Sequence, residues 1–311
     1  MSRPSLVRLG ALALLWGSGF FWLKLALHGL NPLQIVLGRL AAGAAVMLVV
    51  VAVGRYSLPR KPAPWAHVTV MAVVANIAPY FLFGWGVERI ASDLAGVLNA
   101  TTPLFTLAFA LAIRSERLSA IRLTGLLLGF AGVVVLAAPQ QTAVLGSPLP
   151  GVGACLLGAA CYAASYVYAR RFLTGRGLSA LVLSTGQLAA GAALLALVAP
   201  VVARNPMSLT PTVLASVLVL GVLGTGVAYV LNYQLIADEG AVAASTVTYL
   251  IPVVAVVLGA LILNEPLTWN LLVGAGIVLV GVAVAEGRFG KVRRLFVMKR
   301  GAKVLLTLTL A

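Results

Sequence analysis

The stretch Arg39-Leu40-Ala41-Ala42-Gly43-Ala44-Ala45 returns as Gln187-Leu188-Ala189-Ala190-Gly191-Ala192-Ala193, which lies 148 residues further along the chain. Beyond it the offset settles at 149 and stays constant across three apolar segments without a gap. The matched pairs are Tyr80 with Tyr229, Ala95 with Ala244, Pro103 with Pro252, Glu116 with Glu265, Leu118 with Leu267, Ser119 with Thr268, Gly125 with Gly274 and Gly132 with Gly281. A constant offset over this length predicts an internal duplication. We assign residues 1–140 to the first half, 141–287 to the second half and 288–311 to a basic tail.

The composition predicts that both halves lie in a membrane, where lipid is the solvent. Of the 311 residues, 61% are hydrophobic and 9% are charged, whereas soluble domains are about 45–50% apolar and 25% charged. So few charges cannot cover the outside of a soluble core of this size. The net charge of +15 does not predict a nucleic-acid partner, because the Lys and Arg residues cluster between apolar segments and in the tail, where lipid headgroups attract them.

Ten apolar segments are each long enough to cross the hydrocarbon layer, which takes roughly 20 helical residues. The predicted spans are 7–27, 33–53, 67–86, 94–113, 119–137, 150–170, 178–202, 211–235, 243–263 and 268–285. The first is longer than the apolar core of a secretory signal and many spans follow it, so we expect a transmembrane helix there. Most Lys and Arg residues fall on the side that holds both ends of the chain, so the positive-inside rule places both termini in the cytoplasm.

An odd number of spans in each half makes the second half enter the membrane from the opposite side. The loop charges agree, because Arg114 and Arg117 in the loop after the fourth span correspond to Leu263 and Pro266 after the ninth, where the rule disfavours positive charge. We therefore predict an all-α integral membrane fold with ten transmembrane helices in two inverted-topology five-helix repeats around a central cavity. Many transporters use this arrangement and bind substrate near the bilayer midplane.

Several motifs together resemble the EamA type of the drug/metabolite transporter superfamily over residues 7 to about 286. They are Leu15-Trp16-Gly17-Ser18-Gly19-Phe20 and the paired ends Pro103…Glu116-Arg117-Leu118-Ser119…Gly125…Gly132 and Pro252…Glu265-Pro266-Leu267-Thr268…Gly274…Gly281. The resemblance implies a basket of inward-packed helices that exports amino acids, metabolites or toxic compounds across the bacterial inner membrane. Aromatic amino acid exporters are the first members for comparison. We expect a monomer without a cofactor, whose partners are a small-molecule substrate and the lipid bilayer.

Polar and aromatic side chains deep in the spans are the candidates for substrate binding, since each is costly in lipid and tends to face protein or a water-filled cavity. Asn76, Tyr80 and Phe83 share one helical face, and their counterparts 149 residues later are Thr225, Tyr229 and Asn232. The full candidate set is Trp16, Phe20, Asn76, Tyr80, Phe83, Asn99, Tyr162, Tyr166, Tyr229, Asn232 and Tyr249. Such rings and amides can bind planar ligands, amines or carboxylates. The alternative is that they pack between helices.

Pro103 and Pro252 form a matched pair inside the fourth and ninth spans. A proline removes a backbone hydrogen bond and frees a carbonyl upstream, which a Thr or Asn side chain can satisfy. The pair predicts matched kinks, used either as gating hinges or as plain structural bends. Arg39 is the most unusual charge, about six residues into the second span. It is suited either to binding a substrate carboxylate or to bonding helix carbonyls near the outer surface.

The sequence disfavours rival functions. It contains no phosphate-binding Gly-x-x-x-x-Gly-Lys-Ser/Thr motif, so it predicts no ATP-driven pump. The seven acidic residues lie at span ends or in loops, which leaves either proton coupling through an end carboxylate such as Glu88 or passive equilibration of the solute. A membrane enzyme built on Ser18 would need a base nearby, yet the two histidines, His28 and His67, lie at span ends. A metal site lacks clustered ligands. A passive channel remains the main alternative to a transporter.

Overall fold

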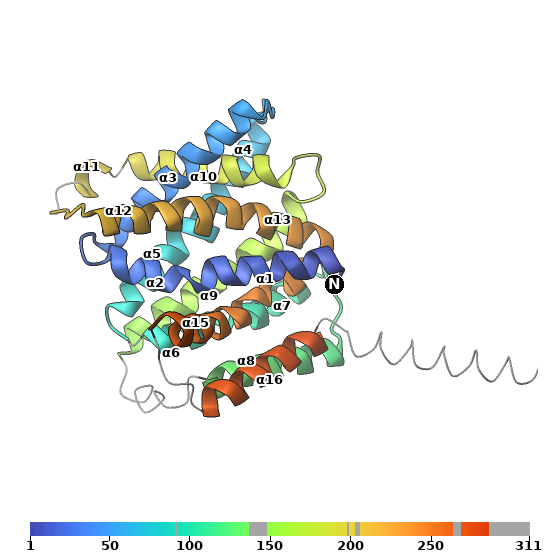
Figure 1. Ribbon diagram of the computed structural model, residues 1–311. Helices are drawn as coiled ribbons and strands as arrows, with labels where there is room; N and C mark the ends of the chain where they lie inside the picture. Colours follow the sequence, from blue (N-terminus) through green and yellow to red (C-terminus); the bar gives the residue numbers. More distant parts are fainter. Residues whose placement is uncertain (91, 137–147, 198, 203–205, 264–268, 286–311) are drawn as a thin grey trace, which may run out of the picture.

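The computed structural model describes residues 1–90, 92–136, 148–197, 199–202, 206–263 and 269–285, and over these ranges it contains helices and no strand (Figure 1). The elements are α1 (Arg3–Gly17), α2 (Gly19–Ala26), α3 (Pro32–Val53), α4 (Pro62–Met71), η1 (Ala72–Ile77), α5 (Ala78–Val87), α6 (Ser92–Asn99), α7 (Thr102–Ala112), α8 (Ala120–Leu136), α9 (Leu149–Phe172), α10 (Ala180–Ala196), α11 (Ala199–Val202), α12 (Pro211–Leu218), η3 (Val219–Val227), α13 (Ala228–Glu239), α14 (Ala241–Ser245), α15 (Val247–Leu263) and α16 (Trp269–Ala285). The predicted basic tail, 288–311, lies outside the described residues.

Helices occupy all ten of the predicted segments, and the differences lie at their ends and in breaks within some of them, such as those between α1 and α2 and between α6 and α7. The third segment begins at Pro62 rather than near residue 67, because proline is well tolerated in the first turn of a helix and the prediction treated it as a breaker. The eighth continues to Glu239 and ends at Gly240, whose φ of 91° stops the helix. The seventh contains two helices, α10, which ends at Ala196, and the short α11, which ends at Val202.

Among the described residues, six helical stretches are long and apolar enough to cross a membrane by length and composition. They are Arg3–Leu23, Pro32–Val53, Pro62–Val87, Leu94–Ala112, Leu149–Phe172 and Pro211–Glu239. The shorter apolar stretches are Ala120–Leu136, Ala180–Ala196, Ala241–Val254 and Trp269–Ala285. Large apolar side chains such as Val49, Leu127 and Leu279 are exposed on the outside of the bundle, as expected for a surface that contacts lipid.

Two segments of π-helix occupy matched positions. η1 (Ala72–Ile77) and η3 (Val219–Val227) overlap when residues 149 apart are compared. The wider turns of a π-helix change which face of the helix each side chain occupies, and they often mark functional sites. Carbonyls at the matched positions Ala75 and Gly224 both accept hydrogen bonds from side chains of other helices. The two segments therefore create equivalent polar sites in the middle of the bundle.

Helices α8 and α16 lie side by side along one edge of the bundle (Figure 1). Glycines make the close approach possible, because a Cβ atom at Gly281 would lie 2.3 Å from the backbone nitrogen of Gly129, and one at Gly125 would lie 2.2 Å from that of Ala285. The counterparts Gly274 and Gly132 contact the opposite helix equally closely. Small residues are the usual means of close helix packing in lipid.

Candidate functional site

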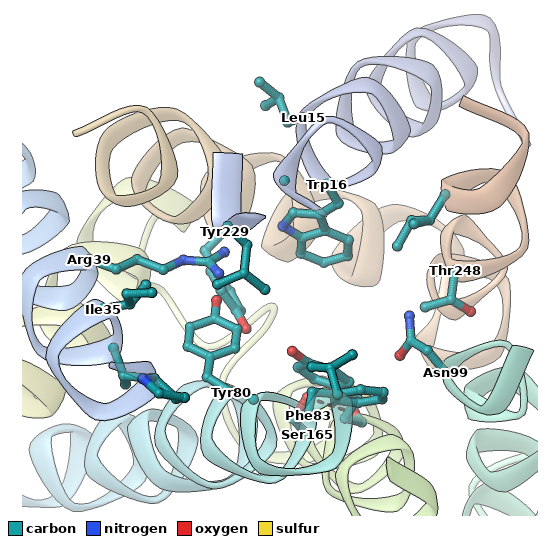
Figure 2. Close-up of a pocket in the computed structure, with 18 of the residues that line it drawn as sticks. Leu15, Trp16, Ile35, Arg39, Tyr80, Phe83, Asn99, Ser165, Tyr229 and Thr248 are labelled. Carbon is teal, nitrogen blue, oxygen red and sulfur yellow. Dashed lines mark hydrogen bonds between the residues drawn. The ribbon is translucent and has the colours of Figure 1, made fainter. Parts of the chain in front are cut away.

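A cavity in the centre of the bundle is the candidate functional site (Figure 2). Its volume is about 140 Å³. Its lining runs from Trp16 and Tyr166 in the middle of the bundle to Leu27, Pro32 and Val87, which lie at the end where α2 meets α3 and α5 finishes. The cavity therefore reaches from the bundle centre towards one end.

Most of the predicted substrate-binding residues line this cavity. They are Trp16, Tyr80, Phe83, Asn99, Tyr162, Tyr166, Tyr229 and Asn232. The rings contact one another across the space between helices: Phe83 and Tyr162 stack with centroids 5.9 Å apart, and Trp16 meets Tyr229 edge-on at 6.0 Å. Aromatic walls of this kind suit a planar ligand.

Arg39 lies on the cavity wall and makes all of its described contacts with neutral groups. Its Nε donates to Thr225 Oγ1 at 2.5 Å and its Nη2 donates to the carbonyl of Gly224 at 3.1 Å. The guanidinium carbon lies 4.1 Å from the centre of the Tyr80 ring, a cation–π geometry. Both predicted possibilities therefore stay open, because the side chain bonds a helix carbonyl and also faces the cavity.

The residue that corresponds to Arg39 in the second half makes the reciprocal contact. Gln187 donates from Nε2 to Asn76 Oδ1 at 2.5 Å, while Arg39 donates to Thr225, the counterpart of Asn76. Each half therefore extends a side chain from one helix to the π-helical segment of the other half. The two contacts differ in charge and surroundings, since Gln187 is fully buried and does not line the cavity.

Asn76 belongs to a buried polar chain behind the cavity wall. Its amide donates to Tyr80 Oη at 3.1 Å, and Gln187, which bonds it, accepts a hydrogen bond from Tyr233 Oη. The asparagine is fully buried and does not line the cavity. Through its hydrogen bond to the Tyr80 hydroxyl, Asn76 positions the Tyr80 ring, which does line the cavity.

Three buried polar atoms on the cavity wall have no hydrogen-bond partner among the described residues. They are Asn99 Oδ1, Tyr166 Oη and Asn232 Oδ1. A buried polar group without a partner costs roughly 1–3 kcal/mol, and unpaired groups of this kind are rare in native proteins. All three residues line the same cavity.

Two other residues of the predicted substrate-binding set, Tyr249 and Phe20, are not among the described residues that line the cavity. Tyr249 is fully buried against α8, where its hydroxyl donates to the carbonyl of Leu126 at 2.8 Å, and it does not line the cavity. The Phe20 side chain lies outside the described residues. The cavity wall also includes Ser165 and Thr248, which the prediction did not single out as substrate-binding. Ser165 donates to the carbonyl of Tyr162 in its own helix, and Thr248 donates to the carbonyl of Ser245 at the end of α14. Both hydroxyls are therefore satisfied by nearby backbone, and the sequence alone does not mark either residue as a ligand-binding one.

The two prolines have different local structures. The chain leaves the helix between α6 and α7 just before Pro103, and the Asn99 carbonyl upstream accepts a hydrogen bond from Thr102 Oγ1 at 2.7 Å. This is the kind of side-chain compensation that the sequence predicts. Pro252 lies inside the continuous helix α15, and the break in its segment precedes it, at Thr246. A matched pair of hinges stays a prediction.

Polar contacts join helices at the end of the bundle that lies away from Leu27 and Pro32. Arg8 on α1 forms an ion pair with Asp238 at the end of α13. The backbone nitrogen of Ser2 donates to Glu239 at 2.9 Å. From α9, Arg170 donates to the carbonyl of Ala237 at 2.6 Å. We call this group the end latch.

Comparisons with known proteins agree with this architecture. A family model described as the EamA-like transporter family matches residues 7–138 and 149–286. An uncharacterized transporter of Archaeoglobus fulgidus is 26% identical over 272 residues, which cover 86% of this chain and 94% of that protein. The uncharacterized inner membrane transporter YedA of Escherichia coli is 27% identical over 293 residues, which cover 90% of each chain. A solved crystal structure that is 22% identical in sequence aligns with a TM-score of 0.74, and the alignment covers 91% of this chain and 98% of the chain in that structure. These two chains therefore share a fold.

Proposed function

This chain belongs to the EamA-like transporter family of the drug/metabolite transporter superfamily, and from that membership we propose that it exports small organic solutes by alternating access. The solutes are amino acids or related metabolites, with aromatic amino acids and planar drugs as the first candidates. The observation that carries the proposal is the central cavity, whose wall combines aromatic rings with buried polar atoms that have no partner. Such a wall suits a solute that is bound in transit.

The topology that we propose is ten spans in two inverted halves, 1–140 and 141–287, with both termini in the cytoplasm. The reciprocal contacts of Arg39 and Gln187 support it, as do the matched π-helical segments and the paired glycines of α8 and α16. At 17 residues each, α8, α10 and α16 are about 26 Å long, which is within the range of transmembrane helices.

Alternating access needs a cavity that is closed at one end, and two features support this. The end latch joins α1, α9 and α13 at the end away from Leu27 and Pro32. Buried apolar residues, Leu9 and Leu12 of α1 with Ile236 of α13 among them, fill the core between the latch and the cavity. In the proposed topology the latch is cytoplasmic, so this conformation would open to the outside. A permanently open channel would have no such closure.

The described carboxylates bear on the energy source. Glu88, Glu116, Asp238 and Glu239 each pair with a cation outside the cavity, and the described lining contains no carboxylate. We therefore favour passive equilibration of the solute over proton antiport, which commonly uses a carboxylate inside the membrane.

Purified protein in liposomes tests the function. We expect labelled aromatic amino acids or related metabolites to enter with saturation as their concentration rises. Flux that increases linearly without limit would indicate a channel. An absence of flux across a broad panel of metabolites would contradict the transporter proposal.

The end latch gives a prediction about conformation. In a variant with Cys155 and Cys161 replaced by alanine, a cysteine introduced at Leu9, which is 3% exposed, should react slowly with a maleimide. Asp238→Asn removes the ion pair with Arg8, and since an exposed pair contributes about 0.2–1 kcal/mol, labelling should accelerate up to about fivefold.

Glu88→Gln is the matched control, because it removes an ion pair with the neighbouring Arg89 at the other end of the bundle. Labelling of the Leu9 cysteine should be unchanged in this variant. Equal acceleration by both substitutions would show that the latch does not close this end of the protein.

A further inference from the structure

The described lining of the cavity contains one charge, which no described carboxylate neutralises. Arg39 is the charged residue of the described lining, and its described partners are a hydroxyl, a carbonyl and an aromatic ring. The described carboxylates are all paired with other cations. A half-buried cation without a described carboxylate partner gives the cavity wall a positive charge, which favours an anion.

Packing alone does not explain this charge. At the corresponding position of the second half, Gln187 makes the same contact between halves with a neutral amide. A glutamine at position 39 would serve the same structural purpose with Thr225. The guanidinium is therefore additional to what the fold needs, and it occurs in the half where the side chain faces the cavity. This asymmetry between equivalent positions indicates a role in ligand binding.

The opposite wall of the cavity has a different polarity. Figure 2 shows Arg39 on one side of the cavity, and Asn99 with Thr248 on the other, with Trp16 and Tyr80 between them. Asn99 is 6% exposed and its Oδ1 atom lacks a described partner. A carbonyl oxygen accepts hydrogen bonds and cannot donate them. This wall therefore favours a ligand that carries a hydrogen-bond donor.

We infer that the cavity selects an aromatic monoanion: a planar ring with a carboxylate at one end and a hydroxyl or amino donor at the other. The carboxylate binds Arg39, the ring lies among Trp16, Tyr80 and Phe83, and the remote donor bonds Asn99. An α-amino acid fits less well, because its ammonium group is next to the carboxylate and would lie beside the guanidinium. This inference rests on the proposed function and narrows its solutes from amino acids and related metabolites to aromatic carboxylates without an α-ammonium group.

A series of competitors tests the ligand class on the wild-type protein. The reference probe is 4-hydroxyphenylacetate, which has both features. Phenylacetate lacks the donor, 4-methoxyphenylacetate has only an acceptor there, tyramine replaces the carboxylate by a cation, and tyrosine adds an ammonium group beside the carboxylate. Binding is measured by the shift in thermal midpoint in detergent, and transport is measured in liposomes. We expect the reference to bind about tenfold more tightly than phenylacetate and 4-methoxyphenylacetate, since leaving the Asn99 oxygen unsatisfied costs about 1–3 kcal/mol. We expect it to bind about tenfold or more tightly than tyramine and tyrosine, since a hydrogen bond to a charged group such as Arg39 contributes about 1.5–3 kcal/mol.

Two substitutions assign the ends of the ligand. Arg39→Gln should weaken binding of 4-hydroxyphenylacetate by about ten- to a hundredfold and should leave tyramine almost unaffected. Asn99→Leu should remove the advantage of the hydroxyl over the methoxy compound while the preference for carboxylates remains. Arg89→Gln, which changes an exposed cation outside the cavity lining, is the matched control and should bind like the wild type.

Each outcome decides between the two proposals. Tyramine or tyrosine binding as tightly as 4-hydroxyphenylacetate to the wild type would overturn the ligand class, without reference to any variant. Saturable transport of another solute without binding of 4-hydroxyphenylacetate would overturn the ligand class and leave the transporter function standing. Selective binding of 4-hydroxyphenylacetate without transport would support the ligand class and contradict the function.

Discussion

Replacing Gly281 by valine should prevent the accumulation of folded protein. A Cβ atom there would lie 2.3 Å from the backbone nitrogen of Gly129 and 2.6 Å from its Cα. The obstacle is the backbone of α8, which cannot move aside as a flexible side chain would. Overpacking generally costs about 1–3 kcal/mol, and more where the surroundings cannot relax. Because α8 and α16 contact each other along their lengths, we expect aggregation during size-exclusion chromatography in detergent.

Gly276→Val in the same helix is the control, because a Cβ atom at Gly276 has nothing within 4 Å. This variant should purify as a monodisperse protein with an unchanged thermal midpoint. A Gly281→Val protein with the same elution profile and thermal midpoint would contradict the close packing of α8 on α16, and with it one of the supports for the inverted repeat.

Gln187→Arg should be nearly as damaging, whereas Arg39→Gln should fold. Gln187 is fully buried and both accepts from Tyr233 and donates to Asn76. An arginine at position 187 would lie beside neither the cavity nor a described carboxylate, and it could not accept the hydrogen bond from Tyr233. A buried charge without a partner typically costs about 3–5 kcal/mol. At position 39 a glutamine replaces a cation beside the cavity with the residue that the second half already uses.

Gln187→Met serves as the neutral comparison. It leaves Asn76 and Tyr233 without their partner but adds no charge, so the loss should be intermediate, about 1–3 kcal/mol. The thermal midpoint should therefore be highest for Arg39→Gln, intermediate for Gln187→Met and lowest for Gln187→Arg. Equal midpoints for the two charge-changing variants would show that positions 39 and 187 have equivalent surroundings, contrary to the cavity described here.

Much of the cavity could be predicted because the chain repeats itself. The constant offset paired Tyr80 with Tyr229 and Phe83 with Asn232, and all four of these residues line the cavity. Asn76 shared their predicted face but points to α10. Its oxygen accepts a hydrogen bond from Gln187 on that helix. This is a contact between helices, which a pattern based on 3.6 residues per turn cannot detect.

Other features required the tertiary structure. Tyr249 has the composition of a ligand-binding residue, yet Gly129 leaves a gap in α8 that its ring fills. Nothing within the segment of Tyr249 reveals that gap. The missing partners of Asn99 and Asn232 are likewise properties of the assembled bundle, since a sequence identifies a polar group but not whether another helix will satisfy it.

The most direct test of the account is trans-stimulation in liposomes. A cavity that opens alternately to the two sides returns faster when it carries a solute, so liposomes preloaded with unlabelled solute should take up labelled solute several times faster than empty ones. We expect this acceleration for whichever solute shows saturable uptake. If preloading leaves the initial rate unchanged, the solute does not cross by alternating exposure of one central site, and the central claim is contradicted.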